Sequence, residues 1–197
     1  IYLDTDTYFL ASIGNIFENI RNGALYMHVQ ESILSQEVNP MMRKLNRFLK
    51  KNEPLIIKGK QVHIPADIAM WNAGMLGFHT GHAPLLEEIS QFTDEVYRIF
   101  PKHVVEQFAF SFYFQQTGNV KSSAAHIFHY WNFKEMRAYL KSFFAHFSAA
   151  SWADLARYST LIQPQVQLQE MIGFYRARNG WEKMRRKSWE PVMPDWD

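Results

Sequence analysis

The first chemically suggestive feature of the sequence is Asp4-Thr5-Asp6, which follows the apolar run Ile1-Tyr2-Leu3. On an extended chain, residues two apart point to the same face, so the two carboxylates would lie side by side. Hard divalent cations prefer oxygen ligands and can hold a phosphate at the same time. The sequence therefore predicts a cation site at the end of a short strand, with a turn or helix cap as the alternative interpretation.

Two further motifs place polar groups in apolar surroundings. Asn72-Ala73-Gly74 interrupts the apolar segment from residue 68 to residue 78. Glycine in a strand indicates a bulge or the close approach of a ligand, and an asparagine amide can bind sugar hydroxyls. Glu106-Gln107 lies at the start of an apolar helix, where polar side chains either cap the helix or face a cleft.

Histidines supply the next candidate ligands. His126 and His129 lie in an aromatic segment, and Lys134 follows them. A neutral imidazole can complete the ligand set of Mn²⁺ beside carboxylates. A lysine at this distance could reach a diphosphate.

In this order, the motifs resemble the retaining glycosyltransferases of the glycogenin and lipopolysaccharide galactosyltransferase type, which have the GT-A fold. The resemblance implies that Asp4, Asp6 and His129 bind Mn²⁺ (or Mg²⁺), which would hold the diphosphate of a nucleotide-sugar donor. It implies transfer of the sugar to a saccharide or another hydroxyl acceptor. It also implies roles for further residues: Glu106 and Gln107 in catalysis, and Asn72, Ala73, Gly74 and Lys134 in substrate binding.

The motifs differ from the family pattern at three places. Trp71 stands where the family has phenylalanine, and Glu106 stands where it has aspartate. The segment from His129 to Lys134 lacks the family's glycine and is one residue short, which leaves His126 as an alternative metal ligand.

These residues need a scaffold, and the hydrophobic pattern predicts one of alternating strands and helices. Strands are expected at 1–3, 24–29, 55–57, 61–64 and 122–131, and helices at 11–22, 40–52, 84–100, 104–114 and 165–177. The alternation predicts an α/β fold over residues 1–134, interpreted as a partial GT-A (Rossmann-like) sheet with flanking helices. Residues 135–197 are expected to form a helical C-terminal extension.

Composition narrows the function classes. The chain has 197 residues, 47% hydrophobic content, a formal net charge of +2 and no cysteine. Thiolate metal sites and disulfides are therefore excluded, and a surface for binding nucleic acid is not expected. No apolar run is long enough to span a bilayer. The lack of cysteine fits a reducing compartment, and a cytoplasmic protein is expected. GT-A enzymes carry their nucleotide-binding part before the Asp-x-Asp motif. The chain is therefore expected to be a fragment of a longer enzyme, or else a shortened relative that no longer binds a nucleotide in this way.

Two alternatives belong to other functional classes. His79-x-x-His82 and His126-x-x-His129 have the spacing of metal ligands and would fit a histidine-metal enzyme. A non-catalytic interaction module is the other, with a basic tail that could contact the inner membrane surface peripherally. The tail carries Arg176, Arg178, Lys183, Arg185, Arg186 and Lys187, and its Trp181 and Trp189 are expected to pack back on the domain. The sequence identifies neither the donor sugar nor the acceptor.

Overall fold

The computed structural model describes residues 1–178 and 188–191, and the chain divides into two compact units. The first unit comprises Ile1–Thr5 and Ala11–His129, and the second comprises Asp6–Leu10 and the chain from Tyr130 onward. The described residues form a mixed α/β fold with small sheets and no closed barrel, which confirms the α/β class. The GT-A assignment stays a prediction. Along the sequence, the last residue of the first unit is His129, which is five residues before the predicted boundary at residue 134.

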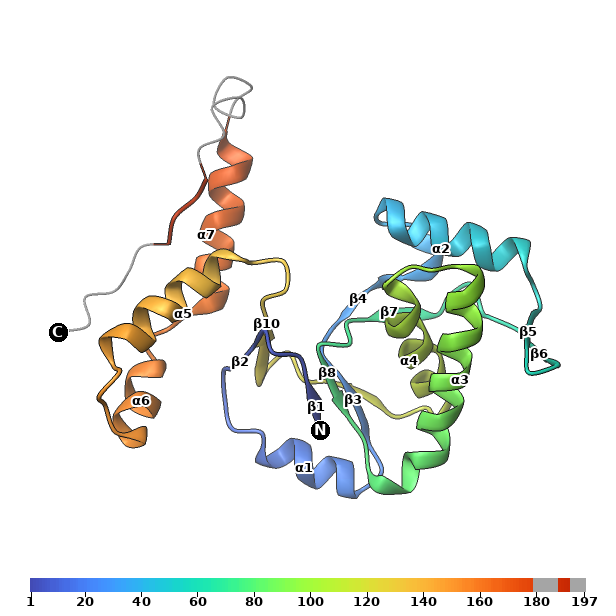
Figure 1. Cartoon of the computed structure of the whole chain (residues 1–197), viewed down its shortest axis with the longest axis horizontal. Helices are drawn as coiled ribbons and strands as arrows, with labels where there is room; N and C mark the ends of the chain where they lie inside the picture. The colour runs from blue at the N-terminus through green and yellow to red at the C-terminus, as the bar shows by residue number, and fades with distance from the viewer. Residues whose placement is uncertain (179–187, 192–197) are drawn as a thin grey trace. The chain divides into compact units, whose positions relative to one another are not determined.

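The elements are short in the first unit and mostly helical in the second (Figure 1). The strands of the first unit are β1 Tyr2–Leu3, β3 Leu25–Met27, β4 Gln30–Ile33, β5 Leu55–Ile57, β6 Lys60–Val62, β7 Ala69–Trp71, β8 Met75–Gly77, β9 Val120–Ser122 and β10 Ile127–His129. Its helices are α1 Gly14–Arg21, α2 Pro40–Lys51, α3 Ala83–Ile99 and α4 Val104–Gln116, with 3₁₀ turns at Leu34–Gln36 and Thr80–His82. The second unit has β2 Thr7–Phe9, α5 Glu135–His146, α6 Trp152–Ser159 and α7 Pro164–Ala177.

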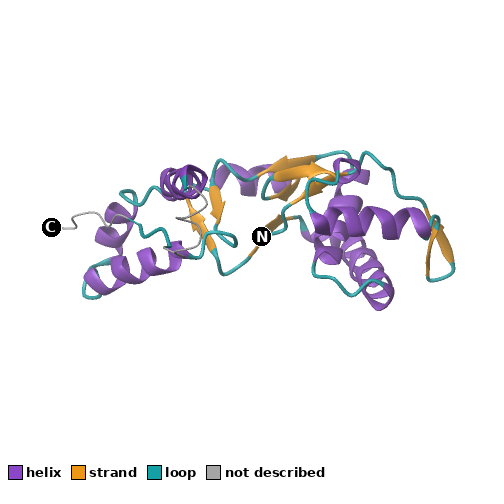
Figure 2. Cartoon of the chain, turned by 90° about the horizontal axis from the view of Figure 1, so that it is seen from above, coloured by secondary structure: helices purple, strands orange, loops and turns teal. Residues whose placement is uncertain are grey.

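A four-stranded mixed sheet forms the centre of the first unit, in the order β1-β8-β3-β9. Strand β8 runs antiparallel to β1 and to β3, and β3 runs parallel to β9. Strands β3 and β8 are buried along their whole length, as expected for the middle of a sheet covered on both faces. The β5–β6 hairpin stands apart from this sheet in Figure 2. The sheet brings β1, which leads into Asp4, next to β8.

Helices α3 and α4 lie side by side and form the largest part of the core (Figure 1). Phe92 of α3 has its ring centroid 5.8 Å from those of Phe108 and Phe112 of α4. Such tilted aromatic pairs add to the stabilisation from the buried apolar area. Helix α4 is therefore buried nearly all round, as its apolar sequence predicts.

Three polar residues of α4 are spaced four apart, namely Gln107, Ser111 and Gln115. Two of them form hydrogen bonds with backbone groups of strand β7. Ser111 accepts a hydrogen bond from the Trp71 backbone N–H at 2.9 Å. Gln115 accepts from the Ala69 N–H at 3.0 Å and donates to the Ala69 carbonyl at 2.7 Å. Residues four apart share one helix face, so Gln107 points the same way. The helix thus satisfies backbone groups that β7 does not pair with β4.

The expected single strand at 122–131 is wrong. The segment forms two short strands, β9 and β10, with a turn between them. The Ser122 hydroxyl accepts a hydrogen bond from the Ala124 N–H at 3.2 Å, and the Ser123 carbonyl accepts from the His126 N–H at 2.8 Å. Local serine hydrogen bonds of this kind compete with strand pairing and start turns.

In the second unit, the expected packing of Trp189 is confirmed. Trp189 is buried, and its ring centroid lies 5.8 Å from that of Phe133. The backbone N–H of Trp189 donates to the Tyr175 hydroxyl at 3.2 Å. Trp181 and the basic residues Lys183, Arg185, Arg186 and Lys187 lie outside the described residues.

Candidate metal centre

Asp4 is held in place by its backbone and by both carboxylate oxygens. Its N–H donates to the Gly74 carbonyl at 3.0 Å, which fixes the chain just after β1. Its Oδ1 accepts from the Tyr2 hydroxyl at 2.9 Å, and its Oδ2 lies 3.5 Å from Nε2 of His129. The hydrogen bond to Asp4 raises the pKa of Tyr2, because the neutral phenol is the donor.

His129 ends β10 and is 8% exposed. Its Nδ1 lies 2.8 Å from Oδ1 of Asn72. The orientation of the Asn72 amide follows from its partners, because Oδ1 also accepts from the Gly74 N–H at 2.9 Å. Oδ1 is an acceptor, so Nδ1 of His129 carries the proton and donates it. With Nδ1–H donated to Asn72, Nε2 is the ring atom that faces Asp4, and it is the atom through which a neutral histidine in this tautomer binds metals.

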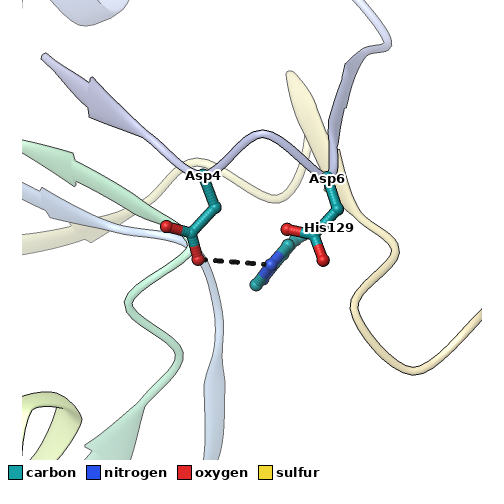
Figure 3. A group of neighbouring side chains, drawn as sticks. All are labelled: Asp4, Asp6 and His129. Carbon is teal, nitrogen blue, oxygen red and sulfur yellow. Dashed lines mark ion pairs between the residues drawn. The ribbon is translucent and has the colours of Figure 1, made fainter.

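Asp6 completes a group of three potential ligands. One ligand atom each from Asp4, Asp6 and His129 lies within 4.8 Å of the others (Figure 3). Ligand atoms on one Mg²⁺ ion lie about 3.0 Å apart when adjacent and about 4.2 Å apart when opposite, so the three atoms are near the spacing that a shared ion requires. Carboxylates suit both Mn²⁺ and Mg²⁺, an imidazole beside them favours Mn²⁺ over the harder Mg²⁺, and three protein ligands leave coordination positions for a substrate. The three residues could therefore hold a metal ion.

Gly74 makes this arrangement possible. A Cβ atom at position 74 would overlap the imidazole ring of His129. The sequence predicts either a bulge or the close approach of a ligand at this glycine, and in the structure the group that approaches is a protein side chain. Gly77 has the same kind of explanation, because a Cβ there would lie 2.8 Å from Cδ1 of Ile20.

A hydrogen-bonded chain leads from His129 to α4. Asn72 is 5% exposed and donates through Nδ2 to Oε1 of Glu31 at 3.0 Å. Gln107 donates through Nε2 to the other oxygen, Oε2, of Glu31 at 2.9 Å. The resemblance assigns Asn72 to substrate binding and Gln107 to catalysis. In the structure Asn72 contacts His129 directly, and Gln107 is linked to Asn72 through the Glu31 carboxylate.

The remaining predicted site residues are Glu106, Ala73 and Lys134, and they are not part of the group of potential metal ligands. Glu106 is exposed in the first turn of α4, and Ala73 is half-buried against the main core. Lys134 is the exposed N-cap residue of α5, in the second unit. No described contact links these three side chains to the carboxylates, so their roles stay predictions.

The histidines of the alternative metal site do not come together in the described part of the chain. The single group of three or more potential ligands found there contains neither His126 nor His79 nor His82. His79 and His82 instead stabilise a 3₁₀ turn: Nδ1 of His79 accepts from the Gly81 N–H at 3.1 Å, and Nδ1 of His82 accepts from the His79 N–H at 3.2 Å.

Four residues around the centre were not predicted: Tyr2, His28, Glu31 and Arg137. Within the second unit, Nη2 of Arg137 lies 4.0 Å from Oδ2 of Asp6. Arg137 follows Lys134 by three residues, so the two cations occupy neighbouring positions on one helix face, and this spacing was a signal available in the sequence. Glu31 and His28 carry no such signal, because their partners are distant in sequence.

His28 packs against His129 in the buried part of the first unit. Its ring centroid lies 5.7 Å from that of His129, and its Nε2 donates to the Ile127 carbonyl at 3.0 Å. Burial lowers the pKa of His28 from its ordinary value of 6.5, although the hydrogen bond to Ile127 opposes the shift. Folded His28 therefore takes up a proton at lower pH than unfolded His28 does.

We expect the free energy of unfolding to decrease as the pH falls from about 6.5 toward the lower folded pKa, because the unfolded state binds the proton first. Urea unfolding at pH 7.5, 6.5 and 5.5 measures this dependence. It should be shallower in His28→Gln than in the wild type, whereas His103→Gln, at an exposed position, should behave as wild type. Equal slopes in the wild type and His28→Gln would contradict the expectation.

Within the described ranges, no helix is long and apolar enough to cross a membrane. Searches of protein-family models, curated proteins and solved structures found no match to this chain.

Proposed function

We propose that this protein is a metal-dependent glycosyltransferase, in which Asp4, Asp6 and His129 hold Mn²⁺ or Mg²⁺ and a nucleotide-diphosphate sugar is the donor. The acceptor is a saccharide or another hydroxyl compound. The observation that carries the proposal is that one ligand atom from each of these three side chains lies within 4.8 Å of the others, with Nε2 of His129 facing Asp4 and Nδ1 bound to Asn72. The order of the motifs along the chain supports it further, through the resemblance to retaining glycosyltransferases.

When bound, the cation would offset the negative charge that develops on the leaving diphosphate. The side chains bind and orient the reactants around it. Lys134 is the N-cap residue of α5 and Arg137 lies in the first turn of that helix, with its Nη2 4.0 Å from Oδ2 of Asp6. A guanidinium can bind phosphate oxygens through two parallel hydrogen bonds, whereas a lysine acts as a point charge. We assign both to the diphosphate.

Glu106 is the candidate to face the reacting sugar. Its carboxylate is exposed, and its negative charge contributes to the raised pKa of Tyr2, after the larger effects of the hydrogen bond to Asp4, the charge of Asp4 and burial. The charge of Glu106 therefore acts on Tyr2, the residue that donates to Asp4. A carboxylate there can stabilise positive charge on the sugar ring or accept hydrogen bonds from its hydroxyls. Asn72 and Gln107 act mainly by positioning, since their amides already bind Glu31.

The test is donor turnover by the full-length protein. A panel of nucleotide-diphosphate sugars is incubated with the protein and Mn²⁺, and the released nucleoside diphosphate is measured with and without saccharide acceptors. We expect release that stops on addition of EDTA and returns with excess Mn²⁺. If calorimetry shows that Mn²⁺ binds but no donor is turned over, the proposed transferase activity is contradicted, whereas the assignment of the metal ligands is supported.

A further inference from the structure

Glu31 lies outside every motif considered in the sequence, yet both of its carboxylate oxygens accept hydrogen bonds near the metal centre. It is an exposed residue of β4, and its partners Asn72 and Gln107 come from two other parts of the first unit. Strand β4 pairs with β7, which ends immediately before Asn72. The carboxylate therefore joins the strand pair to the first turns of α4.

The donor and the acceptor of each hydrogen bond that links Glu31, Asn72 and His129 follow from the groups that these side chains carry. An ionised carboxylate only accepts, so Glu31 requires the NH₂ group of Asn72 on its side. That leaves Oδ1 of Asn72 on the opposite side, where it accepts from Nδ1–H of His129 at 2.8 Å. A flipped amide would place NH₂ against the Gly74 N–H and leave Glu31 facing an oxygen. Glu31 and Gly74 thus select the same orientation of Asn72.

We infer that Glu31 is a positioning residue of the metal centre: through Asn72 it holds His129 in the tautomer whose Nε2 lone pair faces Asp4 and the metal. The inference rests on the metal centre of the proposed function. Histidines that bind metals commonly donate their second N–H to a carboxylate or carbonyl, which sets the tautomer and raises the basicity of the ligand. Here the amide of Asn72 connects the histidine to the carboxylate.

Metal affinity tests the role without requiring turnover. Binding of Mn²⁺ to the full-length protein is measured by calorimetry and by the loss of the free-ion EPR signal. We expect Glu31→Ala to weaken binding about tenfold or more, the range found when such partners are removed. Glu31→Gln should recover most of the loss, because its side-chain oxygen can still accept from Asn72. Glu31→Thr serves if the alanine variant does not fold, since threonine suits a strand.

Glu87→Ala is the matched control. Glu87 is also exposed and also accepts a hydrogen bond from a glutamine amide, with Nε2 of Gln91 at 3.1 Å, but it lies on α3. Its loss should leave the affinity for Mn²⁺ unchanged. A wild-type affinity in Glu31→Ala, or in Glu31→Thr where the alanine variant does not fold, would overturn the inference.

The tautomer of His129 gives a second readout that a merely structural role would not change. Imidazole ¹⁵N shifts of the metal-free protein should show the Nδ1–H form in the wild type and a mixture of tautomers in Glu31→Ala. If the wild type binds no Mn²⁺, the proposed function fails, and these shifts still decide the role of Glu31. An unchanged Nδ1–H form in Glu31→Ala would then overturn it.

Discussion

Gly74→Ala is expected to abolish Mn²⁺ binding by the full-length protein. A methyl group at position 74 occupies the space of the His129 ring, which must leave its present position. The same residue orients two other groups, since its N–H donates to Asn72 and its carbonyl accepts from Asp4. A shift of the backbone at this point would therefore misplace two ligands and the partner of one of them.

Calorimetric titration with Mn²⁺ measures the effect, and Gly173→Ala provides the control. Gly173 lies in α7, where an added Cβ would meet no atom within 4 Å. Alanine in a helix interior is about 0.5–1 kcal/mol more favourable than glycine, so this control should fold at least as well as the wild type.

A double-mutant cycle separates loss of the ligand from general damage. Forcing an extra methyl into a packed site costs about 1–3 kcal/mol of stability. In a His129→Ala background, where the ring is gone, Gly74→Ala should cost much less, because interacting residues show non-additive effects. Additive losses of stability, or wild-type Mn²⁺ affinity in Gly74→Ala, would contradict the seating of His129 against Gly74.

The double variant Asp4→Asn, Asp6→Asn is expected to lose both Mn²⁺ binding and metal-dependent sugar transfer. Asparagine keeps the shape of the side chain, and its oxygen can still accept from Tyr2, but it removes the two negative charges that attract the cation. Metal stabilisation of a leaving group is worth several kcal/mol, so a fall of about a hundredfold or more in turnover is expected.

Donor turnover under saturating donor, with Mn²⁺ varied, checks this expectation. The matched control is Asp67→Asn, Asp94→Asn, because both of these aspartates are exposed and lie outside the metal centre. Turnover that is unchanged in the Asp4, Asp6 variant would refute the assignment of the metal ligands, even if the protein is a transferase.

The parts of the fold that were predictable from sequence are those with local signals. Asn39 and Pro40 predict the start of a helix, and Oδ1 of Asn39 accepts from the Met41 and Met42 N–H groups at 2.9 Å. The apolar face of α3 and the proline after it define that helix in the same way. The sheet order was not predictable, because pairing of β1 with β8 joins segments more than 70 residues apart and leaves no local pattern.

In the candidate site too, residues with local sequence signals were predictable, and residues with distant partners were not. The two aspartates lie two residues apart, and their shared role is visible in the sequence. The sequence also suggested a polar role for Asn72, but its partner was expected to be a sugar. Its partners are Glu31 and His129, which are 41 and 57 residues away in the sequence. The sequence around an asparagine does not indicate which distant group its amide will bind. Second partners of this kind become visible only when the chain is folded.

The polar face of α4 has a consequence for association between molecules. A strand with an unpaired edge is a template for a strand from another chain, which is a common route to aggregation. On β7, the backbone groups of Ala69 and Trp71 that such a strand would use are already bound by Gln115 and Ser111. The helix therefore closes this edge of the strand pair to strand addition, and does so with side chains that cost the core little apolar surface.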